Sequence, residues 1–224
     1  MSMFPTKLVE GYRNFRAGRY TSENDRYRHL AETGQRPETL IIACCDSRAA
    51  PETIFDSAPG ELFVVRNVAN LVPPFSPDDK HHGTSAALEF ALVALKVKNV
   101  VVMGHGRCGG IAAALAENPE PLTPGDFIGK WISLLEKPVA ECACHPDDTP
   151  DERRLRLERA SILHSIDNLR SFPCVQHLEG RGRLSLYGAW FDISLGELHV
   201  YEPETGQWTR PEAHGLSDAP HAAE

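Results

Sequence analysis

The feature that most constrains the fold is a pair of short, uninterrupted apolar runs, residues 39–44 (TLIIAC) and 99–103 (NVVVM). Such runs are typical of strands buried on both faces of a parallel sheet. Residues 61–66 (ELFVVR) predict another strand, and residues 84–97 predict a helix opened by a Thr or Ser cap. Alternation of strand and helix predicts an α/β fold, with a central, mostly parallel sheet flanked by helices.

The second half of the chain continues this pattern. Apolar and helix-forming segments predict helices at residues 109–115, 127–135 and 152–170. Two strand-like runs at residues 183–193 and 196–201 surround a turn, which predicts a hairpin at the sheet edge.

The N-terminal segment differs from the rest because it is polar and rich in charge. Its apolar and aromatic positions are Leu8, Tyr12, Phe15 and Tyr20. We expect amphipathic helices over residues 5–33 that lie outside the core and pack on a partner subunit. We therefore expect one domain over residues 1–210, with a helical arm at residues 1–33 and a disordered tail at residues 211–224.

Composition narrows the function. The chain has 224 residues, 42% of them hydrophobic, which suits one compact domain. Its formal net charge of -8 argues against a general binder of nucleic acid or of anionic membranes. We see neither a signal-peptide core nor an apolar run long enough to cross a bilayer, so we expect a cytoplasmic protein. Six cysteines are too few for a disulfide scaffold in a chain of this length.

Three potential metal ligands stand where predicted strands end or the next helix begins: Cys44, His105 and Cys108. The carboxyl ends of strands are where open α/β sheets bind ligands. Two thiolates and one imidazole suit Zn²⁺, and a set of three ligands leaves a fourth position open, as in catalytic sites. Taken singly, each cysteine could instead be core material. Together they predict one Zn²⁺ per chain.

Strand alternation chooses between the neighbouring thiols of Cys44 and Cys45. If the strand stays extended, Cys44 shares a face with Asp46 and Arg48, and Cys45 points away. A carboxylate held by a guanidinium stays ionised, and it can accept a hydrogen bond from water on the metal. Asp46 and Arg48 could alternatively form a purely structural ion pair.

The other cysteines give weaker signals. Cys142, Cys144 and His145 form a cluster in an acidic, proline-flanked region without a nearby fourth ligand, which argues against a second metal site. Cys174 is expected in the core.

Two motifs together resemble the signatures of one enzyme family. The sequences CCDSR at residues 44–48 and HGRCGG at residues 105–110 are similar to the C-x-D-S-R and H-x-x-C signatures of the β-class carbonic anhydrases. The likeness extends over nearly the whole chain. It implies that Cys44, His105 and Cys108 bind zinc and that Asp46 and Arg48 form a catalytic dyad.

The resemblance also implies a substrate site. Gln35 would donate a hydrogen bond to the substrate, Phe63, Val68 and Phe90 would line a narrow carbon dioxide pocket, and Gly109 would complete the substrate-binding set. The activity implied is that of a carbonate dehydratase, a zinc lyase. In it, zinc-bound hydroxide reversibly hydrates carbon dioxide to bicarbonate and a proton.

Departures from the family pattern refine this expectation. The allosteric bacterial group has a Trp three residues before its first zinc cysteine, but this chain has Ile41 there, so it resembles the plant-like group. Phe90 stands where plant-like members often carry Tyr. The resemblance further implies a homodimer or a dimer of dimers. Two alternatives stay open: a carbon disulfide or carbonyl sulfide hydrolase on the same zinc site, and a non-catalytic zinc-binding scaffold.

Overall fold

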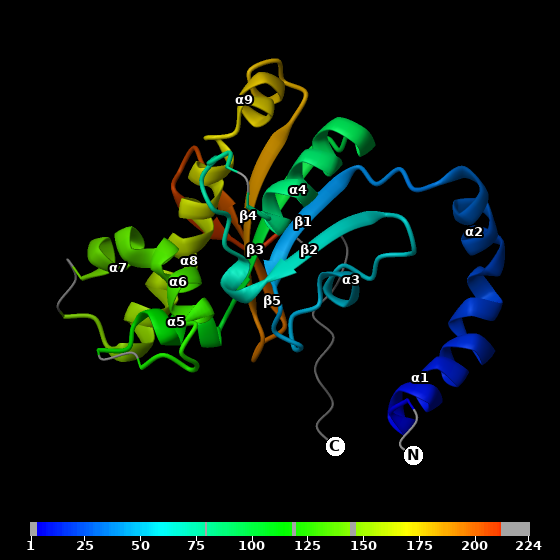
Figure 1. Ribbon diagram of the computed structural model, residues 1–224, viewed down its shortest axis with the longest axis horizontal. Coiled ribbons are helices and arrows are strands. Elements are labelled where there is room, and N and C mark those ends of the chain that lie inside the picture. The colour runs from blue at the N-terminus through cyan, green and yellow to red at the C-terminus, as the bar shows by residue number, and fades with distance from the viewer. Residues whose placement is uncertain (1–3, 79, 118–119, 144–146, 212–224) are drawn as a thin grey trace.

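A computed structural model describes residues 4–78, 80–117, 120–143 and 147–211, and these residues form a six-stranded sheet (Figure 1). The first four strands in the sequence are parallel, and the last two are antiparallel to their neighbours. In spatial order the strands are β2 (Leu62–Asn67), β1 (Thr39–Cys44), β3 (Asn99–His105), β4 (Ser185–Asp192), β5 (Glu197–Glu202) and β6 (Gln207–Thr209). The predicted α/β fold with a mostly parallel sheet is confirmed.

Helices occupy the connections between the first four strands, and turns join β4 to β5 and β5 to β6 (Figure 1). The chain also forms 3₁₀ turns at Val68–Asn70 and Ser133–Leu135 and a π-helical segment at Phe90–Leu95. The α-helices are α1 (Thr6–Ala17), α2 (Arg19–Thr33), α3 (Pro51–Ile54), α4 (Gly83–Glu89), α5 (Gly109–Ala114), α6 (Phe127–Ile132), α7 (Glu136–Cys142), α8 (Pro150–Leu169) and α9 (Pro173–Glu179).

The core follows from strand alternation. On one face of the sheet, Leu40 and Ile42 pack with residues of α4, α8 and α9. On the other face, Ile41 and Ala43 pack with Met103 and with residues near the sheet edge. A third apolar cluster lies beyond the carboxyl ends of β1 and β3, where α5 to α8 gather, and it contains the metal-ligand candidates Cys44 and Cys108.

Helix α8 is the longest element and the main support of this third cluster. It begins at Pro150 with a capping box, in which the Thr149 hydroxyl accepts a hydrogen bond from Glu152 N–H and the Glu152 carboxylate accepts one from Thr149 N–H. Its apolar stripe, which includes Ile162 and Ile166, covers β3 and β4. The helix therefore runs directly behind the strand that carries His105.

Helices α1 and α2 form an arm that extends away from the sheet (blue in Figure 1). Neither helix contains a buried residue. The arm contacts the body through polar bonds near the start of β2: Arg19 donates to the Ser57 carbonyl at 3.0 Å, and Arg26 donates to the Pro59 carbonyl at 2.7 Å. The predicted N-terminal helices are thus present. Leu8 and Tyr12 are exposed in a single chain, whereas the rings of Phe15, Tyr20 and Tyr27 pack against one another.

Some short elements differ from the sequence prediction. The β4–β5 hairpin is present, but β6 pairs outside it and forms the sheet edge. Helix α9 and the single turn α3 were not predicted. Cys144, His145 and the tail from residue 212 lie outside the described residues, so their predictions are not tested. Among the helices that the structure describes, none combines the length and apolar character needed to cross a membrane.

Candidate metal centre

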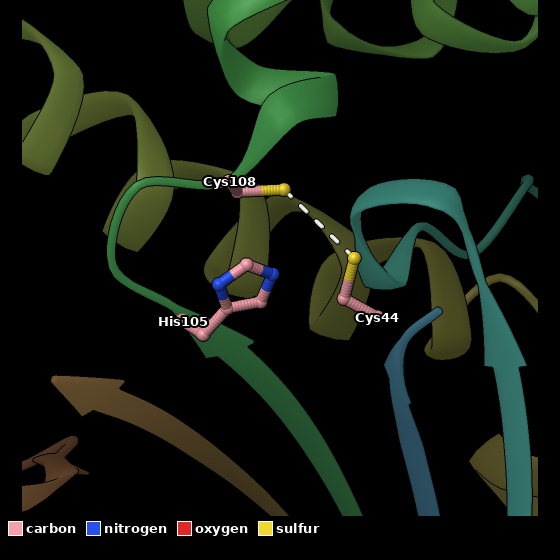
Figure 2. A group of neighbouring side chains, drawn as sticks. All are labelled: Cys44, His105 and Cys108. Atoms are coloured by element: carbon pink, nitrogen blue, oxygen red, sulfur yellow. Dashed lines mark hydrogen bonds between the residues drawn. The ribbon is translucent and has the colours of Figure 1, made fainter. Parts of the chain in front are cut away.

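Neighbouring parallel strands bring the three predicted ligands together. Cys44 ends β1, His105 ends the adjacent strand β3, and Cys108 stands immediately before α5. Their ligand atoms all lie within 4.8 Å of one another, and the two sulfur atoms are 3.9 Å apart (Figure 2). All three side chains are buried. The sheet topology thus makes one compact Cys-His-Cys site from residues 64 positions apart in the sequence.

The His105 ring is oriented for metal binding. Its Nδ1 lies 2.9 Å from the Gly106 carbonyl oxygen, which can only accept, so Nδ1 carries the proton and donates. In the neutral ring Nε2 is then an acceptor, and this buried atom has no hydrogen-bond partner. An unpartnered imidazole nitrogen beside two buried thiols fits Zn²⁺, which accepts nitrogen and sulfur ligands and keeps a fourth position for water at catalytic sites.

Electrostatics within the site favour a thiolate. The hydrogen bond between the two sulfur atoms lowers the pKa of Cys44, although burial opposes this shift. The same interaction raises the pKa of Cys108, so the pair holds one proton more readily than two. The Ala69 N–H also donates to Cys44 Sγ at 3.4 Å. Thiolate is the form that binds metal, so binding of an ion would release the proton that the two sulfur atoms share.

A strained turn presents the Ala69 N–H to the sulfur. After β2 the chain enters the 3₁₀ turn Val68–Asn70, where Ala69 and Asn70 have φ angles of 63° and 50° in the left-handed region. The Trp131 indole fixes this turn by donating to the Val68 carbonyl at 2.8 Å. A Cβ atom at Gly110 would lie 2.9 Å from the Ala69 Cβ, so the close approach of α5 to the turn requires glycine there.

Asp46 and Arg48 form a bidentate pair at the mouth of the site. Arg48 Nε and Nη2 donate to the Asp46 carboxylate at 3.0 and 2.7 Å, and the Arg48 backbone N–H donates at 2.9 Å. These bonds hold the pKa of Asp46 well below its usual range. Its Oδ2 lies 3.8 Å from His105 Nε2. The carboxylate is therefore ionised beside the ligand atoms.

Turn geometry, and not an extended strand, places this pair. The strand β1 ends at Cys44, and the Asp46 side chain accepts the N–H of a residue two positions on, which is an Asx turn. The Arg66 guanidinium holds the same segment by donating to the carbonyls of Cys44 at 2.8 Å and Asp46 at 2.5 Å. The predicted outward direction of Cys45 is confirmed, since that thiol is exposed and lies outside the metal-ligand group.

The predicted substrate residues fall into two groups. Val68 and Gly109 adjoin the metal cluster, because Val68 precedes the Ala69 turn and Gly109 follows Cys108. Gln35 instead precedes β1, and that strand separates it by roughly 17 Å from Cys44, at about 3.3 Å per residue.

Phe63 and Phe90 belong to the distant group. Phe63 lies opposite Leu40 in the register, and Leu40 is about 13 Å along β1 from Cys44 at the usual rise. The two rings pack together with centroids 5.8 Å apart, and Phe90 is half exposed. Within one chain, the predicted substrate site is thus divided between opposite ends of the sheet.

Two further cysteines of the described residues, Cys142 and Cys174, do not join the centre. Cys142 is buried in α7 within the third apolar cluster, and Cys174 is partly buried against the main core. Cys174 thus lies at the core, as predicted.

The geometry fits one class of protein, a zinc enzyme with an open coordination position. Two thiols and one imidazole meet at the carboxyl edge of a parallel sheet, beside an ionised carboxylate. The sequence matches the carbonic anhydrase family over residues 39–198. It is 32% identical over 223 residues to a carbonic anhydrase of Pseudomonas aeruginosa, covering 96% of this chain and 98% of that protein. It is 36% identical over 183 residues to β carbonic anhydrase 5 (chloroplastic) of Arabidopsis thaliana, covering 80% of this chain but only 58% of that protein.

Solved structures agree with the sequence comparison. The β-carbonic anhydrase CcaA shares 30% identity with a TM-score of 0.80, covering 92% of this chain and 98% of that one. A tetrameric β-carbonic anhydrase of Sordaria macrospora shares 28% identity with a TM-score of 0.74, covering 91% and 97%. The chain belongs to the β-class carbonic anhydrase family. Its activity is accordingly that of a carbonate dehydratase, a lyase acting on carbon dioxide and bicarbonate, and the Cys44–His105–Cys108 cluster is consistent with one zinc ion per chain.

Proposed function

We propose that this chain performs the reversible hydration of carbon dioxide at the Cys44–His105–Cys108 centre, with Asp46 and Arg48 as its dyad. One observation carries the assignment of the dyad: the Asp46 carboxylate lies 3.8 Å from the unpartnered Nε2 of His105 while Arg48 holds it in two hydrogen bonds. A purely structural ion pair has no need to face the metal ligands.

The three ligands would hold Zn²⁺, which when bound supplies a Lewis acid that lowers the pKa of a coordinated water to about 7. Asp46, being ionised, can only accept a hydrogen bond, so it would orient the reacting oxygen by accepting a hydrogen bond from it. Arg48 occupies both carboxylate oxygens and prevents Asp46 from turning toward the ligand atoms. Val68, which is 37% exposed, gives the site an apolar wall suited to an uncharged, linear substrate.

The divided substrate residues support a site that a second copy completes. Gln35, Phe63 and Phe90 lie at the amino end of the sheet, too far to contact the metal centre of their own chain. If these residues act on substrate, they act at the centre of a neighbouring chain. We therefore propose a homodimer or a dimer of dimers in which each site draws on both subunits, an arrangement that the tetrameric Sordaria relative supports.

The arm provides a surface for this association, and we expect two charges placed on it to break the assembly. Leu8 and Tyr12 lie one turn apart on α1, with 56% and 61% of their surfaces exposed. The double substitution Leu8→Asp/Tyr12→Asp should shift the mass measured by light scattering toward the monomer and lower the hydration rate in parallel. Glu10→Lys, on the opposite side of the helix, is the matched control. A variant that stays fully assembled would contradict the role of the arm.

We also propose that the chain belongs to the plant-like, non-allosteric group. Ile41 is 2% exposed in an apolar cluster with Ala43 and Met103, so this position offers no hydrogen-bond donor to an anion. The Arg66 guanidinium is engaged with the carbonyls of Cys44 and Asp46. Both features disfavour a bicarbonate pocket at this place.

Stopped-flow measurements on zinc-loaded protein test the function and the group together. We expect the hydration rate of carbon dioxide to rise with pH through a single ionisation near about 7, unchanged in form by added bicarbonate. Asp46 adds no second ionisation in this range, because its lowered pKa keeps it charged throughout. The same protein should turn over carbon dioxide far faster than carbonyl sulfide or carbon disulfide.

Each of these measurements has its own outcome that would contradict the proposal. Preference for carbonyl sulfide or carbon disulfide would assign the site to hydrolysis of those substrates. No turnover of any of the three by zinc-replete protein would indicate a non-catalytic scaffold. A steep, cooperative loss of activity at low pH that bicarbonate deepens would place the chain in the allosteric group despite Ile41.

A further inference from the structure

The loop between His105 and Cys108 must reverse the chain within two residues so that both side chains face one point. Arg107 does this in the left-handed region, at a φ angle of 58°, which disfavours any residue with a side chain. Two bonds hold the first part of the loop: Gly106 N–H donates to the Phe191 carbonyl at 2.9 Å, and the Arg48 guanidinium donates to the Arg107 carbonyl at 3.3 Å. Cys108 itself is held differently.

Cys108 is held by a buried carboxylate that the proposed mechanism does not use. Glu158 lies on α8 and is 3% exposed. Its Oε1 accepts the Cys108 backbone N–H at 3.3 Å, and its Oε2 accepts the indole N–H of Trp190 in β4 at 3.1 Å. This one side chain therefore joins α8, the loop of the metal ligand and the strand next to β3.

Packing does not account for this carboxylate. Position 158 falls in the apolar stripe of α8, in phase with Ile162 and Ile166, where an aliphatic side chain would avoid the cost of burying a charge. The Arg154 Nε lies 3.8 Å from the Glu158 Oε1, which is longer than a hydrogen bond. A cavity of about 150 Å³, lined in part by Arg107 and Glu158, lies beside the loop, so side chains do not fill this space.

We propose that Glu158 is a positioning residue of the metal centre: it fixes Cys108 through the backbone N–H, and Trp190 fixes Glu158 in turn. Loss of a group that hydrogen-bonds to a metal ligand and orients it commonly lowers metal affinity or activity by about 10- to 100-fold. The proposal rests on the metal centre and not on the substrate. Zinc affinity therefore tests it separately from the proposed hydration activity.

The first test is Glu158→Gln. Glutamine has one acceptor oxygen and one NH₂ group, so it cannot accept from both Cys108 and Trp190, and one of the two hydrogen bonds is lost. We expect the zinc dissociation constant, measured by chelator competition, to rise about 10- to 100-fold. The control is Ile166→Val, which creates a small cavity two turns further along the same helix. It should lower the thermal midpoint of the metal-free protein but leave zinc affinity unchanged.

A second pair of variants keeps the test decisive if Glu158→Gln folds poorly. Trp190→Phe removes the indole donor together with part of a buried ring but leaves the Glu158 carboxylate in place, so we expect weaker zinc binding by a smaller factor. In the double variant Glu158→Gln/Trp190→Phe no indole donor competes for the amide oxygen. Glutamine can then accept from Cys108, and zinc should bind more tightly than to Glu158→Gln alone. Wild-type zinc affinity in both single variants, or equal weakening by Ile166→Val, would overturn the proposal.

Discussion

Replacing any one of Cys44, His105 and Cys108 by alanine should remove zinc and reduce carbon dioxide hydration to the uncatalysed background. The three ligand atoms converge within 4.8 Å, and among the residues that the structure describes no other thiol or imidazole joins their group. Two remaining ligands bind Zn²⁺ poorly at a site that already leaves one position open. Elemental analysis of the purified protein and stopped-flow assays measure the two effects separately.

Cys45→Ser is the matched control for these substitutions. It changes a thiol adjacent to a ligand in sequence, but that thiol is exposed and lies outside the ligand group. We expect full zinc content and full activity. Loss of zinc on this change alone would mean that Cys45, and not Cys44, is the ligand.

Asp46→Asn should lower the turnover of zinc-replete protein by about 10²- to 10⁴-fold, the usual contribution of a positioned acid–base group. The amide presents an NH₂ group toward Arg48, so it breaks one of two hydrogen bonds and no longer offers an ionised acceptor to the reacting oxygen. Zinc should stay bound, because Asp46 is not among the ligands. Turnover equal to that of wild type would make the pair structural.

The chain offers a close control for this change. Asp148 also forms a bidentate pair with an arginine, Arg156, at 2.7 and 3.0 Å, and its side chain is 14% exposed against 17% for Asp46. Asp148→Asn should cost a comparable amount of stability and leave turnover intact. A similar loss of turnover in both variants would point to general destabilisation.

The pH dependence of stability separates the stabilising role of the Asp46–Arg48 pair from its role in turnover. The folded-state pKa of Asp46 lies below its unfolded value of about 3.9. The dyad therefore contributes its stability above that unfolded value, and the contribution is lost as the pH falls through the lower folded-state pKa. At any pH used for activity assays the pair is fully formed. A change of rate near neutral pH cannot come from its titration.

Much of the fold was readable from local patterns. Residues 39–44 form β1 with the predicted bounds, because an uninterrupted apolar run can lie only where both faces of a sheet are covered. Strand β2 lies one residue later than predicted, and α8 begins two residues earlier, at its capping box. Short elements such as α9 and β6 were missed, since a few residues carry too little periodicity.

The sequence predicted the residues at the centre of the site but not the residues that position them. Strand ends predicted that the three ligand candidates would meet, which is confirmed, while the role of Asp46 and Arg48 as a dyad followed from the family resemblance and stays a prediction. The Ala69 turn was not predicted, because Asn70 favours the left-handed region only weakly and Ala69 gives no signal for it. Glu158 left one usable signal, a carboxylate in the apolar phase of a helix. The separation of Gln35 from Cys44 follows from the direction of β1. Assigning site residues by their resemblance to family motifs takes no account of that direction.

The division of the substrate residues between two ends of the sheet has a genetic consequence. In the proposed assembly, a chain lacking Cys44 still lends its Gln35, Phe63 and Phe90 to its neighbour, and a chain lacking Gln35 still carries an intact metal centre. Two alleles that are each inactive alone would then restore one another in a mixed assembly. The two alleles would complement each other although both lie in one gene, because each supplies a different half of the active site.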